Sequence, residues 1–235
     1  MGPAMVLCQV SGEELDRLFA DPTLIEQFME DVDARLAAPL EAAYGPRSQS
    51  EITQPGILTV LLWSLGLKKR PDPPPPPVPK SDEELEVERG ERVAKAKEFE
   101  RLTDWLGFLG EDWHIIHCLL TGSATGGPKP ASLLLTAREI GDLEVEFGTA
   151  RGLTVDETKE FAAFLQSIDL KELRDAQDHS WILREDVYFY DFDRLNDDSE
   201  DGGWAYFQDR FDYMKSFVMR TAAKGQGMIV CLSID

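Results

Sequence analysis

The residues best suited to chemistry lie in one short stretch, EDWHIIHCLLTGSATGG, at residues 111–127. It contains a tryptophan, two histidines and a cysteine in an apolar run that ends in a glycine-rich loop. Trp113, His117 and Leu120 recur at helical spacing, so they share one face of a helix that ends near Gly122. The leading interpretation is structural: Trp113 and Leu120 pack in a core, and His117 is a buried histidine with satisfied hydrogen bonds.

A metal site is one alternative for this stretch. His114, His117 and Cys118 stand at positions i, i+3 and i+4, which can present nitrogen and sulfur donors together. However, Ile115 stands where the H-E-x-x-H zinc motif has its glutamate, and the histidines are one residue too close. No paired cysteines or further histidine cluster completes a coordination sphere. The sequence therefore predicts neither a metal nor another cofactor.

Phosphate binding and nucleophilic catalysis have incomplete motifs. Gly122 and Gly127 have the spacing of the outer glycines of a P-loop, but Pro128 replaces the lysine. Ser123 or Thr121 could act as a nucleophile beside the imidazole, but the chain has no G-x-S-x-G elbow there. The absence of a complete catalytic set favours a non-enzymatic protein.

A small-ligand pocket is the stronger alternative to the structural interpretation. Its candidate residues are Trp113, His117, Thr121 and Ser123. The end of the helix offers a hydroxyl, loop amides and a titratable imidazole at one place, and the indole supplies a wall. Such a pocket would belong to a small-molecule-binding or hydrolytic protein.

The charge balance indicates what kind of partner the protein has. Its 235 residues include 44 Asp and Glu against 24 Lys and Arg, a formal net charge of −20. This surface repels phosphate backbones and anionic lipids, which argues against nucleic acid and membranes as partners. A basic protein or a cation suits it better, although solubility alone is a sufficient reason for the charge. The acidic loop at 196–203 lacks the register of a calcium loop. The leading interpretation is a solvated acidic loop. The alternative is a docking surface for a basic partner, whose candidate residues are Asp197, Asp198, Glu200 and Asp201.

Cysteine usage and hydropathy indicate a cytoplasmic location. The three cysteines, at 8, 118 and 231, are too few and too scattered for a disulfide framework. The N-terminus lacks the features of a signal peptide, and no window approaches the length of an apolar membrane span.

The elements that must position these residues can be read from hydrophobic periodicity and capping signals. Ser11 with Glu14, and Thr154 with Glu157, have the spacing of capping boxes that open helices. The expected strands are 4–10, 143–148, 187–192 and 227–235. The expected helices are 11–21, 22–37, 81–110, 153–169 and 204–226, with a helix or turn at 170–177.

We therefore expect an α+β fold in which a small mixed sheet, including both terminal strands, packs with several helices. Residues 1–235 are expected to form a single domain. The proline run at 73–79 should be stiff and extended. Together with the charged helix after it, this run predicts an insertion at 68–100 within that domain.

The run from Trp113 through His117 to Leu120-Thr121-Gly122 resembles the signature W-x-x-x-H-x-x-L-T-G. This is the signature of the YfbM-like family, catalogued as domain of unknown function 1877. The opening Ser11–Leu15, the helix at 154–168 and the close at 204–218 resemble that family in order. The resemblance implies an α+β fold and a small bacterial cytosolic protein. It implies no known activity and no catalytic residues.

These observations favour an acidic protein-interaction module, regulatory or immunity-like, that binds a basic protein without catalysing a reaction. The alternative is a small-molecule-binding or hydrolytic protein with a pocket at His117 and Thr121.

Overall fold

The computed structural model describes residues 4–44, 94–95, 101–110, 112–144, 148–176, 182, 187 and 203–233. Contacts divide the chain into two units, one of residues 1–31 and 104–235 and one of residues 32–103. The second unit holds the C-terminal part of helix α2 (Leu24–Tyr44) and helical residues at 94–95 and 101–102. The predicted single domain stays a prediction. So does the predicted insertion at 68–100, of which only 94–95 are described.

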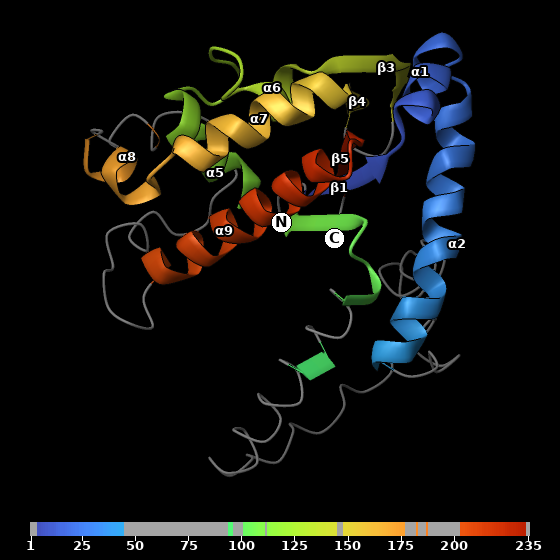
Figure 1. Ribbon diagram of the computed structural model, residues 1–235, viewed down its shortest axis with the longest axis horizontal. Coiled ribbons are helices and arrows are strands. Elements are labelled where there is room, and N and C mark those ends of the chain that lie inside the picture. The colour runs from blue at the N-terminus through green and yellow to red at the C-terminus, as the bar shows by residue number, and fades with distance from the viewer. Residues whose placement is uncertain are drawn as a thin grey trace, which may run out of the picture. The chain divides into compact units, whose positions relative to one another are not determined.

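The first unit is built on a five-stranded sheet in the order β2-β1-β5-β4-β3 (Figure 1). The strands are β1 (Ala4–Val10), β2 (Leu106–Gly110), β3 (Arg138–Glu144), β4 (Thr149–Leu153) and β5 (Gly227–Ser233). The terminal strands β1 and β5 lie side by side, which confirms the expected α+β class and the expected place of both terminal strands in the sheet. Every neighbouring pair is antiparallel, so the sheet is not mixed. Strand direction depends on pairing between distant segments, which local sequence patterns do not encode.

Both faces of the sheet are covered, which explains why β1 is apolar almost throughout. Met5 and Leu7 belong to the large core cluster, whereas Cys8 alternates with them and is buried outside that cluster. Because successive side chains of a strand point to opposite faces, Cys8 lies on the other side of the sheet. Helix α1 (Gly12–Ala20) covers that side, where Leu15 packs on β4 and β5.

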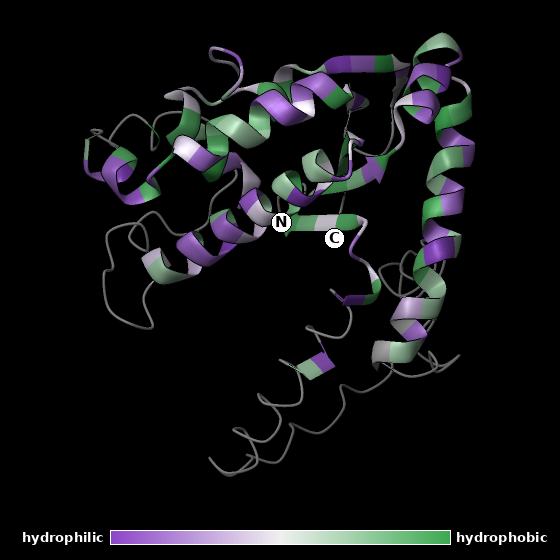
Figure 2. Cartoon of the chain, in the orientation of Figure 1, coloured by the Kyte–Doolittle hydropathy of each residue, from purple (hydrophilic) through white to green (hydrophobic). Residues whose placement is uncertain are grey.

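Several helices cover the face that holds Met5 and Leu7. They are α5 (Trp113–Thr121), α6 (Leu133–Thr136), α7 (Val155–Ser167), α8 (Leu170–Ala176) and α9 (Gly203–Ala223). α7 packs against α9 and also contacts β4 and β5. Hydrophobic and hydrophilic residues alternate along α7 and α9, as expected of helices with one buried face (Figure 2). No helix in the described part of the chain is long and apolar enough to cross a bilayer.

The helix boundaries follow the capping signals of the sequence. Thr154 and Glu157 form a complete capping box, as predicted, because each side chain bonds the other residue's backbone amide. Ser11 accepts a hydrogen bond from the Glu14 amide at the start of α1. The helix expected at 204–226 corresponds to α9, and the segment at 170–177 contains helix α8.

Three expected boundaries were wrong. The helix expected at 22–37 continues through Pro39 to Tyr44, within a run of strong helix formers. The end of the helix expected at 81–110 is instead strand β2, because LGFLG pairs with β1. The strand expected at 143–148 is displaced, since β3 ends at Glu144. The segment at 187–192 lies outside the described residues except for Val187.

The exposed edge of β2 is protected by α9. The Tyr213 hydroxyl of α9 accepts a hydrogen bond from the Phe108 amide of β2 at 3.3 Å. An unpaired strand edge is a template for pairing with another chain, and a side chain bonded to its amide blocks that pairing.

Candidate functional site

The predicted signature folds as a short, buried helix. α5 ends where Gly122 adopts a left-handed conformation with φ of 68°, and the Gly122 amide donates to the Cys118 carbonyl at 2.8 Å. All residues from Trp113 to Leu120 are buried. The predicted helix and its glycine end are therefore confirmed, but the helix is enclosed on every side.

His114 holds the following loop against the helix. Its ring stacks on Trp113 with the ring centroids 4.5 Å apart. Its Nε2 lies 2.8 Å from the Ala124 carbonyl oxygen. Since a carbonyl only accepts, Nε2 must carry the proton and donate. Among the described residues, no three His, Cys, Asp or Glu side chains are arranged to hold a metal ion.

His117 is the unusual residue of the stretch. Its side chain is 0% exposed, and neither Nδ1 nor Nε2 makes a hydrogen bond. The pKa of His117 is lowered from 6.5 to about 4, mainly by burial and secondly by the neighbouring charge of His114. The Gly126 backbone opposes this shift, although its geometry falls short of a hydrogen bond. The ring is therefore neutral at pH 7.

The hydroxyls of Thr121 and Ser123 are used within the loop. Thr121 Oγ1 lies 2.8 Å from the His117 carbonyl and 2.9 Å from the Ser123 carbonyl, and it accepts from the Ser123 amide. Ser123 Oγ accepts from the Gly126 amide at 3.2 Å. Trp113, His117, Thr121 and Ser123 therefore lie in helix α5 and the loop that follows it. The hydroxyls of Thr121 and Ser123 are both bonded to backbone groups.

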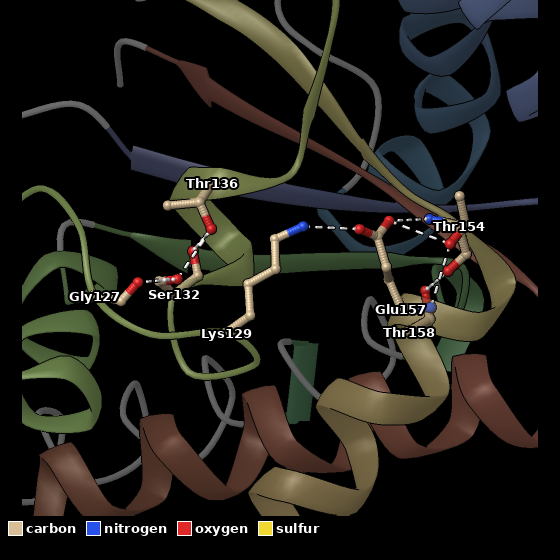
Figure 3. A network of polar contacts seen from close by, with 7 residues as sticks. All are labelled: Gly127, Lys129, Ser132, Thr136, Thr154, Glu157 and Thr158. Carbon is tan, nitrogen blue, oxygen red and sulfur yellow. Dashed lines mark hydrogen bonds and ion pairs between the residues drawn. The ribbon is translucent and has the colours of Figure 1, made fainter.

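The far side of the loop is tied to two other elements (Figure 3). Ser132 Oγ donates to the Gly127 carbonyl at 2.9 Å, which joins the loop to the start of α6. Lys129 Nζ lies 3.1 Å from Glu157 Oε1 in the first turn of α7. Burial alone would raise the pKa of Glu157, but bonds from the Thr154 amide and Lys129 lower it below its usual value. These contacts fix the loop's position.

A polar cluster joins the start of α5 to α9. The Tyr206 hydroxyl donates to Asp112 Oδ2 at 2.9 Å, and Arg210 Nε donates to the Tyr206 oxygen at 3.1 Å. Burial raises the pKa of Tyr206 above its ordinary value. This cluster is not predictable from the sequence, because its members come together from segments far apart in the chain.

The candidate docking residues Asp197, Asp198, Glu200 and Asp201 lie outside the described residues. A different acidic surface lies on α1 and the first part of α2. Residues 11–31 carry seven carboxylates, all exposed, and one arginine. Between the two helices lies a groove of about 120 Å³, which sequence periodicity did not reveal.

The groove between α1 and α2, hereafter the α1–α2 groove, has an apolar floor and a polar rim. The floor is formed by Leu18, Leu24 and Phe28. Leu18 is buried, whereas the other two floor residues are half-buried. The rim consists of four exposed side chains: Glu14, Arg17, Gln27 and Asp31.

Comparisons with known proteins identify a family but no activity. A family model described as a domain of unknown function (DUF1877) matches residues 1–231. No curated protein matches the chain. A solved structure, a protein of unknown function called YfbM from Escherichia coli, is similar at 17% identity with a TM-score of 0.42. The match covers 63% of this chain and 94% of YfbM.

Proposed function

The chain belongs to the family of domain of unknown function 1877, and on that premise we propose that it is a non-enzymatic, acidic protein-interaction module. Its role would be regulatory or immunity-like, and its partner a basic protein.

Charge carries this proposal. The net charge is −20, and residues 11–31 alone expose seven carboxylates against one arginine. Such a surface attracts a basic protein over long range, which accelerates encounter, and it repels acidic competitors. The acidic loop at 196–203 would extend the same attraction.

The burial of His117 supports a binding role over a catalytic one. A catalytic imidazole must come within hydrogen-bond reach of a substrate proton. His117 is 0% exposed, and the neighbouring Thr121 and Ser123 hydroxyls bond the loop backbone. One observation favours the alternative of a small-molecule-binding or hydrolytic protein: both ring nitrogens of His117 lack partners. A bound polar ligand or water would satisfy them.

The proposal is tested with two fluorescent peptides of equal length, in which glycine alternates with either lysine or glutamate. The full-length protein should bind the lysine peptide, and the affinity should fall steeply as salt increases, because the attraction is electrostatic. The glutamate peptide is the matched control and should not bind. Equal binding of both peptides, or no binding of the lysine peptide at low salt, would refute the interaction proposal.

The contribution of the acidic loop is tested in the same assay. Changing Asp197→Asn, Asp198→Asn, Glu200→Gln and Asp201→Asn together should weaken binding of the lysine peptide and reduce its salt dependence. An unchanged affinity and salt dependence would exclude this loop from the docking surface.

A further inference from the structure

We propose that the α1–α2 groove is the specific docking site, and that it receives one lysine or arginine side chain from a basic segment of the partner. This inference rests on the proposed function, since it names the place and the chemistry of that interaction.

The shape of the groove comes from the tight connection between its two helices. Asp21 Oδ1 accepts from the Thr23 amide at 3.2 Å and from the Thr23 hydroxyl at 2.5 Å. The Leu24 amide then bonds the Asp21 carbonyl at 3.2 Å. This turn starts α2 immediately after α1, and the two helices lie at an angle to each other (Figure 1).

The floor of the groove matches the stem of a long basic side chain. Lysine and arginine bury their methylene groups along apolar surface while the charged end stays in water. Leu24 and Phe28 are both half-buried, so they leave apolar surface that such a stem can cover. The ring of Phe28 offers a further attraction, since a cation near an aromatic face is stabilised by its quadrupole. The volume of about 120 Å³ suits one side chain rather than a folded element.

The rim places negative charge where the cationic end would lie. Glu14 and Asp31 line the groove, one on each helix, against a single arginine, Arg17. Asp31 is held in position because its Oδ1 accepts from Gln27 Nε2 at 3.2 Å. Glu13 and Glu30, which stand next to the lining carboxylates in sequence, are also exposed. An anion or an acidic peptide would be repelled from this groove, and an uncharged apolar side chain would gain no attraction from its carboxylates.

Two matched double variants separate the groove from the general acidity of the surface. The groove pair is Glu14→Gln with Asp31→Asn, and the control pair is Glu13→Gln with Glu30→Gln. Each pair removes two exposed carboxylates. One of the two lies in the first turn of α1, and the other is one of two adjacent residues of α2. The net charge and the electrostatics of the helix ends therefore change equally, and both variants should fold like the unaltered protein.

The probe is the lysine–glycine peptide, with its affinity measured by fluorescence anisotropy at low salt. The groove pair should weaken binding about tenfold, the effect of losing two partly exposed ion pairs. The control pair should weaken it by about twofold or less, since it removes only long-range attraction. In the unaltered protein, the amide signals of residues 24–31 should shift as the peptide is added.

The remaining outcomes distinguish the groove from diffuse binding and from competition within the chain. If both pairs weaken binding equally, the peptide binds diffusely, and the groove proposal fails while the interaction proposal stands. If replacing the chain's own basic run, Lys68, Lys69 and Arg70, by alanine tightens peptide binding more than the loss of three positive charges elsewhere in the chain does, that run competes for the groove, and the partner assignment fails. If the unaltered protein binds no lysine peptide at low salt, both proposals fail.

Discussion

At the scale of single residues, His117 has the most unusual environment. A buried polar group without a hydrogen bond costs about 1–3 kcal/mol, and His117 has two such nitrogens. The structure tolerates them because the ring is neutral, its pKa being lowered to about 4. The sequence predicted the buried position correctly from helical spacing. The expectation that the hydrogen bonds of His117 are satisfied was wrong, because those bonds depend on where the backbone of the loop at 122–126 lies.

The lowered pKa makes stability depend on pH in a definite direction. Between pH 6.5 and 4 the unfolded chain binds a proton at His117 and the folded chain does not, so stability falls as pH falls. The contribution is fully present above pH 6.5. Between pH 7 and pH 5, this residue should reduce the free energy of unfolding by about 2 kcal/mol, as the two pKa values imply.

The variant His117→Met isolates this contribution, because methionine has a similar volume and no titrating group. At pH 7 it should leave the free energy of unfolding unchanged or raise it, since two buried nitrogens without hydrogen bonds disappear. Its loss of stability from pH 7 to pH 5, measured by urea unfolding, should be about 2 kcal/mol smaller than that of the unaltered protein. A large loss of stability at pH 7 would show instead that water or a ligand satisfies the ring, in favour of the pocket.

At the scale of elements, local signals were predictable and long-range pairing was not. The capping box of Thr154 and Glu157 and the left-handed Gly122 depend on neighbours within a few residues. Strand β2, in contrast, is five residues long with two glycines and is a strand only because it pairs with β1. The α1–α2 groove was missed for a related reason. Leu24 and Phe28 lie on the apolar stripe of their helix, but periodicity does not show that they are only half covered.

The contact between α1 and the sheet requires a glycine in β4. A Cβ atom at Gly152 would lie 2.6 Å from Leu15 Cδ1 and from Phe19 Cζ. Both side chains are packed between the helix and the sheet, so they cannot move freely. We expect Gly152→Ala to lower the free energy of unfolding by about 1–3 kcal/mol, the usual cost of overpacking.

Gly12→Ala is the matched control, because it adds the same methyl group in α1 itself, where the nearest side chain belongs to α7 rather than to the sheet. Its Cβ would lie 3.4 Å from Val155 Cγ2, an ordinary packing distance, and Gly12 is in the first turn of α1. Alanine there should be neutral or stabilising by a few tenths of a kcal/mol. Urea unfolding measures both variants. If the two variants changed the free energy of unfolding equally, α1 would have to shift away from the sheet at no cost in stability.

At the scale of the whole molecule, negative charge is the dominant electrostatic property. The described ion pairs, such as Lys129 with Glu157 and Arg151 with Glu139, use only some of the basic residues. The net charge of −20 remains, and folding concentrates it into a small volume. Self-repulsion therefore opposes the compact state even as it favours binding of a basic partner.

This repulsion predicts that salt stabilises the protein. Raising the ionic strength from about 0.01 M to 0.15 M shortens the Debye length from roughly 30 Å to 8 Å, which screens carboxylates that lie far apart. The free energy of unfolding should rise by on the order of 1 kcal/mol, because the folded state loses more repulsion than the unfolded chain. Urea unfolding at the two ionic strengths measures the change. The control pair Glu13→Gln with Glu30→Gln should show a smaller gain, since it begins with less repulsion. A loss of stability on adding salt would show instead that short-range ion pairs, which salt weakens, outweigh the repulsion between distant carboxylates.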